Sequence, residues 1–301
     1  MVATAVPSRH RAMAFVALTK PRIIELLLVT TVPTMVLAQQ GMPPIWLMIN
    51  TVVGGTLAAG GANAFNMYID RDIDAVMNRT KGRPLVTGEV APTEALVFAF
   101  AVEAAAFVWL WVLVNLLSAV LALAACAFYV GVYTLWLKRT STQNIVIGGA
   151  AGAVPVLIGW SSVTDSLSWA AVVLFAVIFF WTPPHFWALA IKYTDDYSAA
   201  EVPMMPVVEG YRSTARQMAV YAAIVWVLSL ALWFVAPVGW LYLGTAFVLG
   251  AWFTFGALRL LSETDPEVRS QQAIRYFAFS ITYLTVLFAA LAVDQFVGWG
   301  M

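Results

Sequence analysis

The densest group of polar side chains in this sequence lies between Asn63 and Pro84, in a chain that is otherwise mostly apolar. Asn66, Asp70 and Asp74 follow one another at intervals of four residues, so on a continuous helix they share one face. Two carboxylates and an amide oxygen on one face suit a hard divalent cation such as Mg²⁺, which prefers oxygen ligands and keeps several waters. The spacing therefore predicts a Mg²⁺ site on these three residues.

Cations follow this acidic face directly. Arg79, Lys81 and Arg83 follow in a loop that can bend back toward these carboxylates. Carboxylates alone would repel a phosphate, whereas carboxylates that hold Mg²⁺ beside arginine and lysine side chains would bind one. The segment therefore predicts a diphosphate site at a membrane surface. Asn63, one turn before Asn66, belongs either to this site or to a helix–helix hydrogen bond.

Two further acids lie near or within apolar segments. Asp72 is off the predicted metal-binding face, and we expect it to be solvated or paired with Arg71 or Arg79. Glu103 lies in the middle of a predicted membrane helix without an obvious local partner. Ionisable groups deep in the membrane often have a function, so the role of Glu103 stays open.

Two other polar groups are predicted on the same side of the membrane. The fourth predicted span closes with Tyr133, Lys138 and Arg139. These cations either anchor the helix at the headgroups or neutralise a departing diphosphate. A later loop contains Lys192, Asp195, Asp196 and Tyr197. Its carboxylates are either hydrated, or they form a second acidic cluster that binds a Mg²⁺-bridged diphosphate together with the first cluster.

A histidine follows a proline pair inside the sixth predicted span. The segment runs from Trp181 through Pro183, Pro184 and His185 to Trp187. We expect the prolines to break or kink this helix, which frees backbone groups and opens space. His185 is then either a satisfied polar contact or a ligand and proton carrier.

The elements that must position these residues are membrane helices. Of the 301 residues, 62% are hydrophobic and only 11% are charged, whereas soluble domains have about 25% charged residues. Apolar runs of about eighteen or more residues recur along the chain, as in a polytopic helical membrane protein. The net charge of zero gives no basic surface for nucleic acid. A single cysteine, Cys126, excludes an internal disulfide.

The hydropathy pattern predicts nine membrane-spanning helices in a single domain covering residues 1–301, with residues 1–20 as a cytoplasmic N-terminal tail. We place the spans at residues 23–38, 44–69, 93–114, 116–137, 145–161, 167–191, 215–235, 240–260 and 276–296. With nine spans, all 16 lysines and arginines fall on the side of the N-terminus. The positive-inside rule then puts the N-terminus in the cytoplasm and the C-terminus outside.

The two acidic loops, after the second and sixth spans, are four helices apart. A four-helix unit used twice, followed by a ninth helix, would place both loops over one central cavity. The loops share little sequence, so this prediction depends on their placement alone.

The first motif resembles a signature of a known family. Asn66-x-x-x-Asp70-x-x-x-Asp74, followed by Asn78-Arg79-Thr-x-x-Arg83-Pro84-Leu85, is similar to the first signature of UbiA-type intramembrane prenyltransferases. Other segments resemble one branch of that family, the protoheme IX farnesyltransferases. They are Trp181 to Trp187, Asp195-Asp196-Tyr197, Val202-Pro-Met-Met-Pro206 and Tyr133-Thr-x-x-Leu-Lys138-Arg139-x-Thr-x-x-Asn144.

The resemblance implies a nine-helix fold around a central cavity and Mg²⁺-dependent transfer of a farnesyl group from farnesyl diphosphate to a vinyl group of protoheme IX (haem b). Water adds in the reaction, which gives haem O and diphosphate for haem A and haem–copper oxidase biogenesis. Mg²⁺ is the implied cofactor, and haem b is a substrate. The implied setting is a bacterial inner membrane, with the lipid bilayer, haem A synthase and oxidase assembly factors as partners.

The resemblance also assigns roles to residues. The implied catalytic residues are Asn66, Asp70, Asp74, Lys138 and His185, and the implied metal ligands are Asn66, Asp70, Asp74 and Asp196. The implied substrate-binding residues are Asn63, Arg79, Lys81, Arg83, Tyr133, Arg139, Lys192, Asp195, Asp196 and Tyr197.

The chain departs from the wider family in its second loop. Quinone-type relatives carry a second Asp-x-x-x-Asp, but Ala199 and Ala200 stand four residues after the two aspartates, and Glu201 stands where we expect glycine. A prenyltransferase for an aromatic quinone precursor is the nearest alternative, and both the absent second Asp-x-x-x-Asp and the Pro-Pro-His segment argue against it. A transporter with polar groups at a broken helix is the alternative from another class.

Overall fold

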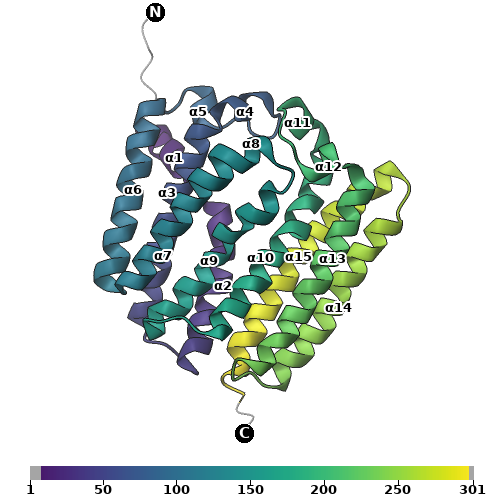
Figure 1. Ribbon diagram of the computed structural model, residues 1–301. Helices are drawn as coiled ribbons and strands as arrows, with labels where there is room; N and C mark the ends of the chain where they lie inside the picture. The colour runs from purple at the N-terminus through teal and green to yellow at the C-terminus, as the bar shows by residue number, and fades with distance from the viewer. Residues whose placement is uncertain (1–7, 298–301) are drawn as a thin grey trace, which may run out of the picture.

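The computed structural model is a bundle of long helices, without strands in the part of the chain that it describes, residues 8–297 (Figure 1). Side chains are described for residues 11–21 and 29–297. Among these residues, 8 helices are long and apolar enough to cross a membrane. They are α3 (Ile45–Ile69), α6 (Pro92–Leu113), α7 with η1 and α8 (Leu116–Thr140), α9 (Asn144–Thr164), α10 (Trp169–Lys192), α13 with η2 (Gly210–Phe234), α14 (Trp240–Ser262) and α15 (Pro266–Asp294).

The segment predicted as the first span is also helical. Helix α2 (Pro21–Gln39) has 19 residues and packs against α3, α9 and α15. It is not part of the count above because the side chains of residues 22–28 lie outside the description. The predicted all-helical membrane fold is confirmed, and the eight counted helices lie at the positions of eight predicted spans.

Helix starts follow from capping residues. Asn115 accepts a hydrogen bond from the Ser118 amide at 2.8 Å and starts α7. Asp265 accepts from the amides of Glu267 and Val268 and starts α15. Side-chain acceptors satisfy amides that lack a partner at helix N-termini. The cap at Asp265 starts α15 ten residues before the predicted span, because the helix extends beyond its apolar part.

The N-terminal segment forms a helix where a tail was predicted. Helix α1 (Ser8–Leu18) packs against α3, α5 (Pro84–Thr87) and α6. Ala14 and Leu18, one helical turn apart, are its buried apolar residues. Burial of this face explains why the segment is ordered onto the bundle. Residues 1–7 lie outside the described part.

The charged connections gather at one end of the bundle. In Figure 1, α4 (Arg71–Val76), α5, α8 (Lys138–Thr140), α11 (Thr194–Ala199) and α12 (Met205–Val208) lie at the end where the chain begins. The chain ends at the opposite end. This arrangement agrees with the predicted placement of the lysines and arginines on the side of the N-terminus.

Glycines allow close packing of the long helices. A Cβ at Gly54 would lie 2.4 Å from the Leu110 side chain of α6. A Cβ at Gly61 would lie 2.7 Å from Oε2 of Glu103, also on α6. Between α9 and α2, a Cβ at Gly159 would lie 2.7 Å from the backbone oxygen of Thr31. These contacts leave no room for a side chain.

We predict that Gly159→Ala destabilises the protein by about 1–3 kcal/mol, since a backbone oxygen cannot move aside as a side chain can. Gly152→Ala, on the same helix, is the matched control because no atom lies within 4 Å of its built Cβ. Thermal unfolding in detergent, followed by tryptophan fluorescence, measures both variants. Equal melting temperatures for Gly159→Ala and the wild type would contradict this account of the α2–α9 contact.

Candidate functional site

Asn66, Asp70 and Asp74 share one face, as the spacing predicts. Helix α3 ends at Ile69 and α4 begins at Arg71. Hydrogen bonds from Asp70 N to Asn66 O (2.9 Å) and from Asp74 N to Asp70 O (2.8 Å) nevertheless continue the helical pattern across the junction. The three side chains are buried, with exposed fractions of 3%, 0% and 2%.

Cations from three segments compensate this acidic face. Lys138 forms an ion pair with Asp70 Oδ2. Arg83 approaches Asp74 Oδ2 to 2.5 Å. Lys20 donates a hydrogen bond to Asn66 Oδ1 at 2.7 Å, and Asn66 in turn donates to Asp70 Oδ2 at 2.7 Å. Buried carboxylates require such partners, because desolvation of an unpaired charge is costly.

The donor set fits Mg²⁺. Mg²⁺ usually takes one or two carboxylates and completes its coordination with waters and phosphate oxygens. Asp70 Oδ1 is buried and has no hydrogen-bond donor in the structure. Arg139, at 3.8 Å from it, is beyond hydrogen-bond distance. This oxygen, with Asp74 and the amide oxygen of Asn66, would hold the metal.

The π-helix η1 (Phe128–Leu137) brings the fourth span to the site. Thr134 Oγ1 accepts a hydrogen bond from Asn66 Nδ2 at 3.1 Å and donates to Tyr129 O, five residues back, at 2.9 Å. The rings of Tyr129 and Tyr133 stack with centroids 5.4 Å apart. Long π-helical stretches are rare and often lie at functional sites. Tyr133 was predicted from the sequence, whereas no motif indicated Thr134 or Tyr129.

Asp72 pairs with a residue that the sequence analysis did not propose. Arg139 contacts both carboxylate oxygens of Asp72 at 2.8 Å. Hydrogen bonds from Arg139 lower the pKa of Asp72 to about 2. Arg71 instead lies over the Tyr68 ring, 4.7 Å from its centroid. The Asp72 side chain is 61% exposed, in line with the solvated alternative, whereas the expected pairing with Arg71 or Arg79 is wrong because the partner, Arg139, comes from another helix.

The two acidic loops meet, as the internal repeat predicted. Asn78 Nδ2 and the backbone amide of Arg79 both donate to the Asp196 carboxylate at 3.2 Å. Arg79 also donates to the hydroxyl of Tyr197 at 3.4 Å, and Lys81 donates to Asn78 at 3.0 Å.

The second loop contributes unequally to the site. Asp195 and Lys192 are exposed and take no part in the contacts above. Within the described side chains, no three acidic, histidine or cysteine residues gather at one point. Asp196 therefore does not join Asp70 and Asp74 here, and its role as a metal ligand stays a prediction.

His185 lies inside the bundle in a well-defined setting. Its ring stacks between Trp181 and Phe277, with centroids 4.2 and 4.5 Å away. Its Nδ1 lies 2.6 Å from Ser280 Oγ. Helix α10 continues through Pro183 and Pro184, so of the predicted break or kink, the break is wrong. Packing of α10 against α9, α13 and α15 accounts for this, since neighbouring helices support prolines in membrane helices.

Three further polar residues complete the description. Asn63 donates to Thr19 O at 3.2 Å, in the link between α1 and α2 that also carries Lys20, and both alternatives for this residue stay open. Glu103 is buried, and its Oε2 has no hydrogen-bond partner among the described residues. Glu201 is exposed and has a φ of 54°, a left-handed conformation that glycine adopts more easily.

Lys20 is a site residue that was not predicted from the sequence, where it is one of the cations outside the spans. Burial lowers its pKa to about 7, and the charges of Arg83 and Lys138 add to this effect. Its position just before Pro21 was the one available signal, because a residue before proline rarely continues a helix. The link between α1 and α2 thus reaches the acidic face.

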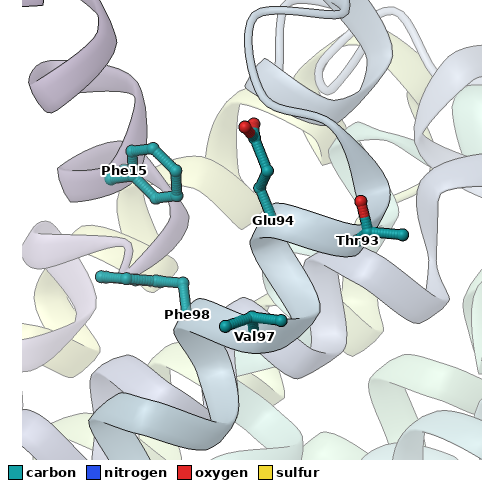
Figure 2. Close-up of a pocket in the computed structure, with 5 residues that line it drawn as sticks. All are labelled: Phe15, Thr93, Glu94, Val97 and Phe98. Carbon is teal, nitrogen blue, oxygen red and sulfur yellow. The ribbon is translucent and has the colours of Figure 1, made fainter.

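A separate groove lies between α1 and α6, outside the acidic site. Figure 2 shows Phe15, Thr93, Glu94, Val97 and Phe98 around a hollow of about 390 Å³. None of the predicted site residues lines it.

We predict that Asp70→Asn and Asp74→Asn each weaken Mg²⁺-dependent diphosphate binding at least about 10-fold, since even outer-shell changes at metal sites have effects of this size. Asp72→Asn is the matched control because its side chain is 61% exposed. Calorimetric titration of the detergent-solubilised protein with Mg²⁺ and inorganic diphosphate gives the three affinities. Wild-type affinity for Asp70→Asn would exclude this carboxylate as a ligand.

The chain matches a known family over most of its length. Residues 27–293 match the model of the UbiA prenyltransferase family. The chain is 55% identical over 288 residues to the protoheme IX farnesyltransferase of Frankia alni, covering 94% of this chain and 98% of that protein. It is 53% identical over 292 residues to the same enzyme of Streptomyces coelicolor, covering 96% and 93%.

Solved structures share the fold. A structure of digeranylgeranylglyceryl phosphate synthase has a TM-score of 0.77 and 15% identity, over 96% of this chain and 100% of that one. A UbiA homolog from Archaeoglobus fulgidus, solved with DMAPP and Mg²⁺, has a TM-score of 0.68 and 17% identity, over 91% and 99%. The family match, the close relatives and the shared fold agree with the motif around Asp70 and Asp74. The chain therefore belongs to the UbiA prenyltransferase family.

Proposed function

We propose that this chain transfers the farnesyl group of farnesyl diphosphate to a vinyl group of protoheme IX, with addition of water, and releases diphosphate and haem O. The product would serve haem A and haem–copper oxidase biogenesis. The observation that carries the proposal is the buried Asn66–Asp70–Asp74 face enclosed by Lys20, Arg83 and Lys138. Relatives named protoheme IX farnesyltransferase, more than half identical over nearly the whole chain, support the choice of substrates.

The diphosphate half of the reaction follows from charge. Asp70, Asp74 and the amide oxygen of Asn66 would hold Mg²⁺, which neutralises charge on the leaving diphosphate. Lys138 and Arg83 already contact these carboxylates, so a phosphate group bound there lies within their reach. Positively charged groups fixed in advance stabilise the diphosphate as the allylic C–O bond breaks.

The acceptor half takes place among apolar helices. The stacked rings of Tyr129 and Tyr133 lie on the segment that also carries Thr134, next to the acidic face. Aromatic faces stabilise cations, and exclusion of water preserves an allylic cation until it meets the vinyl group. His185 lies seven residues before Lys192, the end of α10, or about 10 Å below that end. It is our candidate for contact with the porphyrin.

The second acidic loop would contribute to substrate binding by holding the first loop in place. Asp196 is held by Asn78 and Arg79, so it fixes the loop that carries Arg79, Lys81 and Arg83. We assign Asp196 the further role of a ligand to Mg²⁺ once diphosphate is bound. Tyr197 and Arg139 anchor the same end of the bundle through Arg79 and Asp72.

The proposed location is a bacterial inner membrane, with the N-terminus in the cytoplasm and the C-terminus outside. The gathering of charged loops at the end where the chain begins supports this orientation (Figure 1). Haem A synthase and oxidase assembly factors are the proposed partners, because the product must pass to the next step without leaving the membrane.

Incubation of the purified protein with reduced haem b, farnesyl diphosphate and Mg²⁺ should give a haem whose mass is raised by a farnesyl group plus water. EDTA should abolish the product, because the carboxylates would lose their bridging cation. Mass spectrometry of the extracted haems is the measurement. Prenylation of a quinone precursor in a parallel tube, without any new haem, would replace the proposed acceptor and keep the diphosphate site.

We predict that His185→Ala impairs use of haem b more than use of farnesyl diphosphate, because His185 lies away from the acidic face. The KM for haem b should rise about 10-fold or more, because substitution of a residue that contributes to a metal site usually lowers affinity by this factor. Asp70→Asn serves as the opposite case and should abolish turnover. Steady-state kinetics with each substrate varied in turn separates the two effects. An equal rise in both KM values for His185→Ala would refute this division of labour.

A further inference from the structure

The imidazole of His185 is fixed on three sides. Trp181 and Phe277 cover its two faces, with interplanar angles of 16° and 23°. Ser280 of α15 occupies the edge at Nδ1. His185 is half-buried, whereas Trp181 and Ser280 are 2% and 0% exposed. The part of the ring that these three residues leave uncovered is the edge that includes Nε2.

The hydroxyl of Ser280 makes two short contacts that together fix the protons. Its Oγ lies 2.6 Å from Phe277 O and 2.6 Å from His185 Nδ1. A hydroxyl has one proton, and a backbone carbonyl has none to give. The proton between Ser280 and Phe277 must come from the serine, so the proton between Ser280 and His185 must come from the imidazole. His185 is thus the Nδ1–H tautomer.

This assignment leaves the lone pair of His185 on Nε2. A neutral imidazole with a proton on Nδ1 has its acceptor, and its metal-binding nitrogen, at Nε2. Histidines that bind metals usually donate the other ring N–H to a fixed acceptor, which sets the tautomer and raises the basicity of the ligand. Ser280 provides that acceptor, and its own proton is used by Phe277 O.

We propose that Ser280 is a positioning residue that holds His185 as the Nδ1–H tautomer and presents Nε2 as an axial ligand to the iron of the haem substrate. The inference rests on the proposed function, since it takes the porphyrin as the acceptor. It assigns a task to a residue of α15 that no sequence motif indicated. The stacked rings add to the effect, because they keep the imidazole plane from rotating.

Binding of haem b to the full chain, without farnesyl diphosphate, tests the proposal. Absorbance titration gives the affinity, and resonance Raman spectroscopy of the ferrous complex reports the iron–histidine stretching band. Ser280→Ala should weaken haem binding about 10- to 100-fold and lower the band frequency, since Nδ1–H loses its acceptor. Ser280→Thr retains a hydroxyl and should restore both. His185→Ala should lack the band, and added imidazole should bring it back.

A matched control is Ser229→Ala on α13. Ser229 is also fully buried, and its hydroxyl contacts Val225 O and the Tyr283 hydroxyl instead of a histidine. Ser280→Ala leaves the backbone oxygen that accepts from Trp181 in place. Unchanged Mg²⁺-dependent diphosphate binding shows that each variant is folded.

A wild-type band in Ser280→Ala, or an equal change in Ser229→Ala, would overturn the positioning role. A histidine band that survives in His185→Ala would overturn the ligand assignment. Formation of haem O by a wild-type protein without the band would reject this inference and keep the proposed function. Absence of the farnesylated product in the incubation assay would reject the proposed function itself.

Discussion

Two carboxylates buried one helical turn apart repel each other, and the repulsion grows because protein screens charge less well than water. Asp70 and Asp74 are stable here because Lys138 and Arg83 reach them from segments 68 and 9 residues away in sequence. Lys20, whose pKa burial lowers to about 7, adds a hydrogen bond to Asn66. The acidic face therefore holds three segments together: the link between α1 and α2, the loop before α5 and the end of the fourth span.

The same balance prepares the site for a substrate. In the described structure, the cations satisfy the carboxylates themselves. A divalent cation bound to Asp70 and Asp74 would take over that task, and Lys138 and Arg83 would then be available to a diphosphate. Metal and anion binding would thus support each other, because each supplies the charge that the other needs.

The sequence predicted those parts of the site that depend on local periodicity. Asn66, Asp70 and Asp74 share a face because a four-residue interval does so in any helix. The sequence did not indicate the contacts of Lys20, Thr134 or the Arg139–Asp72 pair, since these depend on how distant helices pack. The predicted break at the prolines of α10 failed for a related reason, because packing against neighbouring helices overrides a local preference.

The π-helix η1 also affects the direction of the side chains that follow it. A π-helical stretch holds more residues per turn than an α-helix, so the residues after it are rotated about the helix axis relative to a continuous α-helix. In this span the rotation lies between Tyr129 and Lys138, where Thr134 contacts Asn66 and Lys138 contacts Asp70. The type of helical turn thus helps to decide which side chains of the span face the acidic site.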